Sequence, residues 1–167
     1  MNQSFTDKYR SRVITLVLAV SYIAVGLILP FGDKKYMFSG NLRGSENAMG
    51  IFDYVAEELN DANITILLLV FFFAGPVLTL IMSGWSINEQ HGSFIGKPRR
   101  SVFMAGLVML VIPVFYILNI PIAQNMIGDN FGLRDFFRAN IGFILTLLFG
   151  LGILVTVWRD PKQAKPV

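Results

Sequence analysis

Residues 64–84, ITILLLVFFFAGPVLTLIMSG, form an apolar run that is interrupted near its middle by Gly75 and Pro76. The hydrocarbon core of a bilayer is about 30 Å thick and a helix rises about 1.5 Å per residue, so about 20 apolar residues cross it. The run contains no charged residue. It therefore has the length and composition of a membrane-spanning helix, although a Gly-Pro pair in a soluble protein would mark a boundary between two elements.

Three further runs share these properties, at 13–31, 102–122 and 141–158, and none contains Asp, Glu, Lys, Arg or His. Over the whole chain, 54% of the residues are hydrophobic and only 15% are charged. This composition is typical of membrane proteins. The sequence predicts an all-α polytopic membrane protein with four transmembrane helices. The transmembrane domain covers 13–158, between a cytoplasmic N-terminus at 1–12 and a cytoplasmic tail at 159–167.

The first run could also be a secretory signal peptide, because basic residues precede it. The apolar part of a signal peptide is about 7 to 15 residues long and is followed by small residues at a cleavage site. Here the run is longer and leads through Pro30 and Phe31 into Asp33. We therefore expect an uncleaved anchor, with a cleaved signal as the alternative.

Lys and Arg are distributed unequally between the two sides of this topology. The N-terminus, the loop between the second and third runs, and the tail contain nine basic and three acidic residues. The two opposite connections contain five basic and eight acidic residues. Because basic residues are enriched in cytoplasmic segments, both termini are predicted to be cytoplasmic, in the plasma (cell inner) membrane. The net charge of +3 is thus attributed to topology and not to nucleic-acid binding.

The connection 32–63 is the longest between the runs. Over 48–62, AMGIFDYVAEELNDA, apolar residues recur at helical spacing, which predicts a short amphipathic helix on the outer side with Asn47 as its N-cap. Its polar face is either solvated or a docking face for a partner, and its residues are Asp53, Glu57 and Glu58. The segment 124–140 mixes aromatic and charged residues and predicts a second interfacial element on the same side.

The prolines inside the second and third runs allow two interpretations. A helical proline lacks the N–H of a normal turn and frees the carbonyl four residues earlier. The result is either a structural kink or a discontinuous helix that forms part of a solute pathway. The residues that would line such a pathway are Gly75, Pro76, Thr79, Pro113, Tyr116 and Asn119.

The four runs lack the residues that many enzymes and carriers need inside a membrane. Ion and proton carriers use ionisable side chains there, and haem needs axial ligands such as histidine. The only histidine, His91, lies in the loop between the second and third runs, and the chain has no cysteine. We therefore expect no catalytic residue, no metal site, no cofactor and no enzyme activity.

The last run carries small residues at helical spacing, which let helix backbones approach closely. They are Gly142, Thr146 and Gly150, with Gly152 nearby. They serve either packing within the bundle or contact with a partner's helix.

We expect a non-catalytic accessory or scaffold subunit of a larger integral membrane complex, whose partners are membrane lipids and other membrane subunits, with no nucleic acid. The alternatives are a homo-oligomeric carrier or channel for a neutral or apolar solute, with a pathway between the second and third runs, and lipid handling through the aromatic residues at 131–137.

Overall fold

The computed structural model describes residues 9–33, 45–58, 60–61, 63–88, 97–127 and 140–160. Helices dominate these residues, as predicted, and a two-stranded sheet that was not predicted is added to them. The helices are α2 (Arg10–Ile28), α4 (Ala48–Glu58), α5 (Asn63–Asn88), α6 (Lys97–Ile127) and α8 (Ile141–Arg159), and the strands are β1 (Gly32–Asp33) and β2 (Ser45–Glu46).

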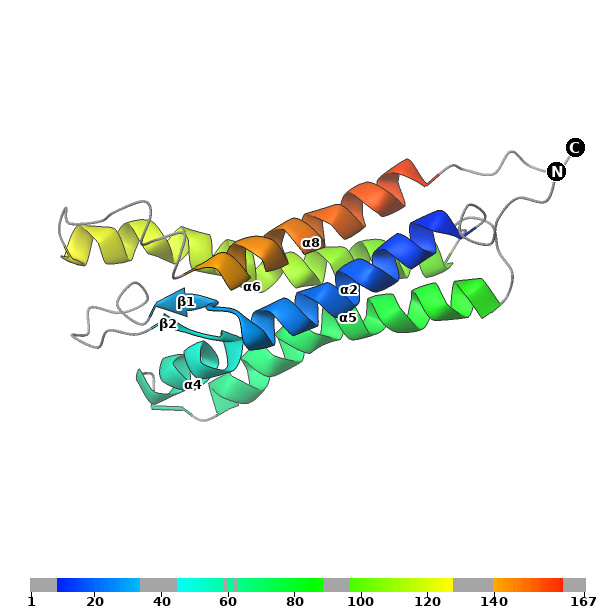
Figure 1. Ribbon diagram of the computed structural model, residues 1–167. Coiled ribbons are helices and arrows are strands. Elements are labelled where there is room, and N and C mark those ends of the chain that lie inside the picture. The colour runs from blue at the N-terminus through cyan, green and yellow to red at the C-terminus, as the bar shows by residue number, and fades with distance from the viewer. Residues whose placement is uncertain are drawn as a thin grey trace, which may run out of the picture.

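The four long helices lie side by side and alternate in direction, which makes an up-and-down bundle (Figure 1). Each packs against the next in the chain, and α8 closes the ring against α2. Three of them, α2, α5 and α8, are long and apolar enough to cross a membrane. The remaining one, α6, has 31 residues and extends beyond the predicted run at both ends. Pro98 falls in its first turn, where a missing N–H breaks no helical hydrogen bond.

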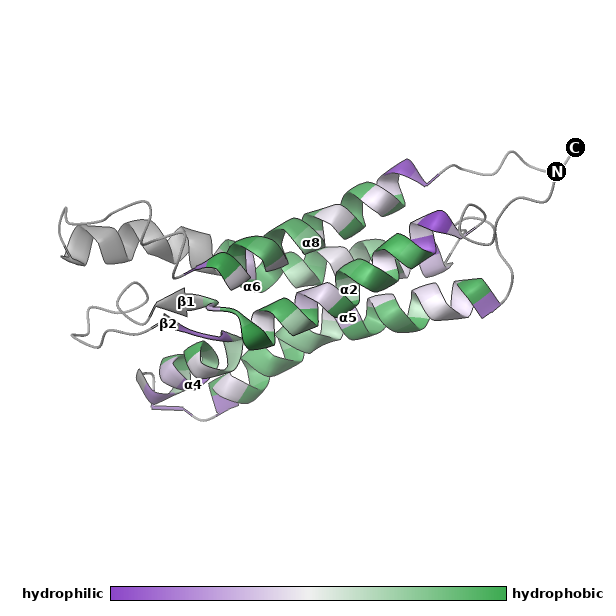
Figure 2. Ribbon diagram, in the orientation of Figure 1, coloured by the Kyte–Doolittle hydropathy of each residue, from purple (hydrophilic) through white to green (hydrophobic). Residues whose placement is uncertain are grey.

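Charged residues gather at the two ends of the bundle, and the stretch between them is largely hydrophobic (Figure 2). One end, where α2 and α6 begin and α5 and α8 finish, is called the basic end (Figure 1). Its described basic side chains are Arg10, Arg12, Arg99, Arg100 and Arg159. The opposite end carries α4, β1 and β2 and is called the acidic end. Exposed acidic residues there are Asp53, Glu57 and Asp61.

The interior of the bundle is more polar than the surface of its long helices. The buried polar residues, each at most 1% exposed, include Thr15, Thr79, Ser83, Ser86 and Thr146. Large apolar residues face outward instead, for example Val17 (58% exposed), Val70 (57%) and Leu148 (53%). A soluble protein buries such residues, whereas lipid tails solvate them as well as a protein core does. The arrangement therefore suits a hydrocarbon environment.

A helix, α4, occupies the first part of the segment 48–62 that was predicted to be helical, and it packs on α5 and α2 at the acidic end. Ile51, Phe52 and Val55 are buried, whereas Asp53 and Glu57 are exposed. The Phe52 ring meets Phe31 and Phe72 edge-on, with centroids 6.2 and 5.7 Å apart. Aromatic packing of this kind adds to the free energy of apolar burial, so α4 is fixed to the bundle. The second predicted interfacial element, in 124–140, falls mostly outside the described residues.

Both ends of α4 are capped. Asn47 accepts a hydrogen bond from the Gly50 N–H (3.1 Å), which confirms the predicted N-cap, and its side-chain amide donates to the Leu27 carbonyl at the end of α2 (2.9 Å). At the other end Asn60 adopts a left-handed conformation with φ of 50°. The Asn60 and Asp61 N–H groups bond back to the last turn of α4, as in a Schellman motif. The caps fix where α4 begins and where it ends.

Candidate functional site

Of the residues predicted to line a pathway between α5 and α6, Gly75 lies where these two helices touch. α5 continues as a helix through Pro76, and Gly75, Pro76, Thr79 and Pro113 are all buried. A Cβ atom at Gly75 would lie 2.8 Å from the Ala105 carbonyl oxygen and would overlap Met109. The backbones of α5 and α6 are therefore in contact at Gly75. The side chains of Tyr116 and Asn119 lie outside the described part, and the pathway role stays a prediction.

Tyr22 of α2 supplies the hydrogen bond that Pro113 removes from α6. Pro113 has no N–H to offer the carbonyl four residues earlier, which is that of Met109. The Tyr22 hydroxyl donates to this Met109 oxygen at 3.1 Å, and Tyr22 is fully buried. A neighbouring helix thus satisfies the freed acceptor, as a proline-containing helix in an apolar environment requires. The bond ties α2 to α6 across the bundle and supports the interpretation of Pro113 as structural.

Tyr22→Phe is expected to destabilise the protein by about 1–3 kcal/mol, because it leaves the Met109 carbonyl buried without a donor. In a Pro113→Ala background the helix can supply its own N–H, so the same substitution should have little effect. Thermal unfolding in detergent of the wild type, the two single variants and the double variant measures the coupling energy between Tyr22 and Pro113. Equal losses in both backgrounds would contradict the assignment.

The small residues of α8 lie against helices of the same chain. The Gly142 N–H donates to the Pro30 oxygen (2.7 Å), and a Cβ at Gly142 would lie 2.8 Å from that oxygen. Gly150 faces Leu110 of α6, and Gly152 faces Leu18 of α2. Thr146 is fully buried, and its hydroxyl bonds to the Phe143 carbonyl (2.8 Å). The contacts at Gly142, Gly150 and Gly152 thus support packing within the chain, the first of the two predicted roles, and contact with a partner through these positions stays a prediction.

The predicted docking face borders a cavity of about 510 Å³ at the acidic end. The cavity is lined by Asp53, Ala56, Glu57, Asn60, Asp61 and Thr65. Asp61 accepts two hydrogen bonds from Asn63, at 2.9 and 2.8 Å, and so belongs to the start of α5. Asp53 and Glu57 are exposed on the turns before it, while the Glu58 side chain is outside the described part. No cluster of three metal-ligating side chains occurs within the described residues.

A buried arginine at the basic end was not predicted. Arg12 falls in the segment predicted as the cytoplasmic N-terminus, 1–12, but it lies in the first turn of α2 and is fully buried. Its Nε donates to the Ser86 hydroxyl of α5 at 2.8 Å, and one turn on Thr15 and Ser83 share a hydrogen bond of 2.9 Å. Asp160, 4% exposed after α8, attracts the guanidinium electrostatically. These contacts join three helices.

The spacing of the small and polar residues of α2 would have indicated this burial. The buried residues of α2 recur three or four positions apart, at Arg12, Thr15, Ala19, Tyr22 and Gly26. In a helix with an otherwise apolar surface, such a stripe marks the side that faces other helices. Arg12 continues it beyond the apolar run. The apolar run alone therefore placed the start of the packed helix too late.

The fold and its end surfaces define a class of protein. Three apolar helices of spanning length, with apolar side chains outward and polar ones inward, indicate a multi-pass membrane protein. No protein-family model, curated protein or solved structure matches the chain.

Proposed function

We propose that the chain crosses the plasma (cell inner) membrane four times, with α6 as the fourth span and both termini in the cytoplasm. The exposed apolar residues of α6, Met104, Leu107, Val111 and Val114, support its placement in lipid beside the other three helices. The separation of basic and acidic ends supports the orientation, because basic residues are retained on the cytoplasmic side. Trp85 and Trp158, both exposed near the basic end, suit the headgroup level.

We further propose that the protein is a non-catalytic accessory or scaffold subunit of a larger membrane complex. The observation that carries this proposal is the attachment of α4. Its apolar face and the bond from the Asn47 amide to the Leu27 carbonyl attach it to the bundle, and its other face presents Asp53 and Glu57 beside the cavity. A rigid acidic surface of this kind suits a basic segment of a partner, because complementary charges direct association. Close packing at Gly75 and Gly142 supports a stable body on which a partner can assemble.

Purification of the C-terminally tagged chain from native membranes in mild detergent, with mass spectrometry, tests this proposal. A stoichiometric set of membrane subunits is expected with the wild-type chain. Asp53→Asn combined with Glu57→Gln should reduce their recovery, and raised salt should act in the same direction through screening. Both residues are exposed, so the variant should fold.

The control is Asp53→Glu combined with Glu57→Asp, which retains both charges and should retain the partners. Recovery of the chain alone or as a homo-oligomer would contradict the accessory-subunit proposal. A partner that is bound equally by the neutralised and the charge-retaining variants would show that the acidic face is not the docking surface.

A further inference from the structure

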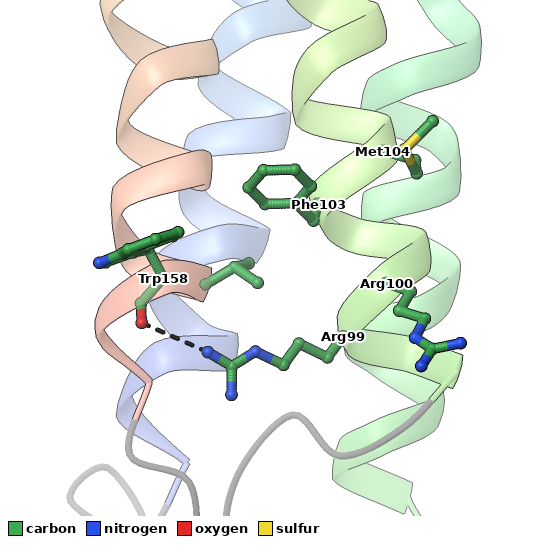
Figure 3. Close-up of a pocket in the computed structure, with 6 residues that line it drawn as sticks. Arg99, Arg100, Phe103, Met104 and Trp158 are labelled. Carbon is green, nitrogen blue, oxygen red and sulfur yellow. Dashed lines mark hydrogen bonds between the residues drawn. The ribbon is translucent and has the colours of Figure 1, made fainter.

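A cavity of about 760 Å³ opens beside the first turns of α6 at the basic end. It is lined by Arg99, Arg100, Phe103, Met104, Val157 and Trp158. Figure 3 shows Phe103 between α6 and α8, on the side of Trp158, and the two arginines nearer the end of the bundle. Both arginines border the cavity, with Arg99 extending toward α8 and Arg100 toward α5 (Figure 3), and the other lining side chains are apolar.

A second cavity of about 400 Å³ lies beside the first. Its lining residues are Phe103, Leu154, Val155, Trp158 and Arg159. Phe103 and Trp158 border both cavities, so the two adjoin over α6 and α8, and together they are here called the lipid groove. Val155 is 49% exposed and Trp158 is 77% exposed, so the apolar wall of the groove opens onto the surface of the bundle.

The charges at the basic end of the lipid groove favour an anion. The first turn of α6 has no acidic residue and contains both arginines. Positive side chains at the positive end of a helix dipole are unfavourable, and an anion bound beside them would reverse this effect. Arg99 Nη2 donates to the Trp158 carbonyl at 3.3 Å, which directs the guanidinium toward the end of α8. Within the described residues this uses one of five N–H groups, and the others can bind phosphate oxygens.

We propose that the lipid groove binds an anionic phospholipid of the inner leaflet, with the phosphate at Arg99 and Arg100 and an acyl chain along Phe103 and Trp158. The arginines select a negative headgroup, and the apolar groove favours a lipid over a soluble phosphate. The inference depends on the proposed four-span placement, in which the basic end lies at headgroup level. It is separate from the accessory role, because the acidic docking face lies at the opposite end.

Native mass spectrometry of the full chain in detergent, with phosphatidylglycerol and phosphatidylcholine of identical acyl chains, tests the proposal. Wild-type protein is expected to bind the anionic lipid more tightly. Arg99→Gln with Arg100→Gln should weaken that binding roughly 30-fold and leave the zwitterionic lipid almost unaffected. Arg10→Gln, an exposed arginine at the same end outside the groove, is the matched control. Val155→Phe, which fills the smaller cavity, should weaken both lipids.

Equal binding of the two lipids by wild-type protein would overturn the proposal, and so would an unchanged lipid preference in the double variant. A third contrary result is complete displacement of the lipid by an equal concentration of inorganic phosphate. The last would indicate a site for a soluble anion. A melting curve shows whether the double variant folds. Should it unfold, Arg100→Gln alone serves, since Arg100 is exposed, and its expected effect is roughly fivefold.

Discussion

Gly75→Ala is expected to destabilise the protein by about 2–3 kcal/mol, although alanine favours helix more than glycine does. The new methyl group would lie 2.8 Å from the Ala105 carbonyl oxygen and would overlap the Met109 side chain. Methionine can adjust its rotamer, but the carbonyl belongs to the backbone of α6 and can move only with the helix. The substitution must therefore separate α5 from α6 at their closest contact.

Gly84→Ala provides the matched control in the same helix. A Cβ at Gly84 meets no atom within 4 Å, so alanine should leave stability unchanged or raise it by up to about 1 kcal/mol. Thermal unfolding in detergent, followed by tryptophan fluorescence, compares the two variants. In a Met109→Ala background, Gly75→Ala should still lower stability relative to Met109→Ala alone, because the clash with the Ala105 carbonyl remains. Identical melting of the two glycine variants would show that α5 and α6 are not in backbone contact.

Arg12→Met is expected to destabilise the bundle by about 3–5 kcal/mol. The substitution removes the positive charge that acts on the buried Asp160 carboxylate and the donor that Ser86 accepts from. Removing one member of a buried charge pair is costly, because the remaining charge loses part of its compensation. Arg12 is thus expected to matter more for stability than any exposed arginine of the chain.

The double variant Arg12→Met with Asp160→Asn separates charge pairing from loss of packing. Without the carboxylate the missing guanidinium matters less, so the double variant should recover more than half of the lost stability. Arg10→Met, two residues away and exposed, should change stability by less than about 0.5 kcal/mol. Chemical or thermal unfolding in detergent measures the stability of these variants. Equal effects of Arg10→Met and Arg12→Met would show that the Arg12 guanidinium is solvated.

The candidate sites were predictable to different degrees. The acidic face with Asp53 and Glu57 followed from helical periodicity, because an amphipathic pattern also states which side chains face outward. The lipid groove with Arg99 and Trp158 did not, because its lining residues on α6 and on α8 lie more than fifty positions apart in the chain. The role of Tyr22 was equally hidden, since Pro113 shows that a carbonyl is freed but not which helix will satisfy it.

The sequence by itself determined the helices, their apolar character, the Asn47 cap and the separation of charge along the chain. Each depends on composition or on neighbours within a few residues, so a local pattern records it. Only the tertiary structure decided which surfaces of the helices meet, and hence that Arg12 is buried, that Gly142 contacts the backbone at Pro30 and that α5 and α6 touch at Gly75. The physical reason is that lipid tails solvate apolar side chains as well as a protein interior does. Helix pairing in such a chain therefore depends on close packing and hydrogen bonds between distant segments, which hydrophobicity alone does not specify.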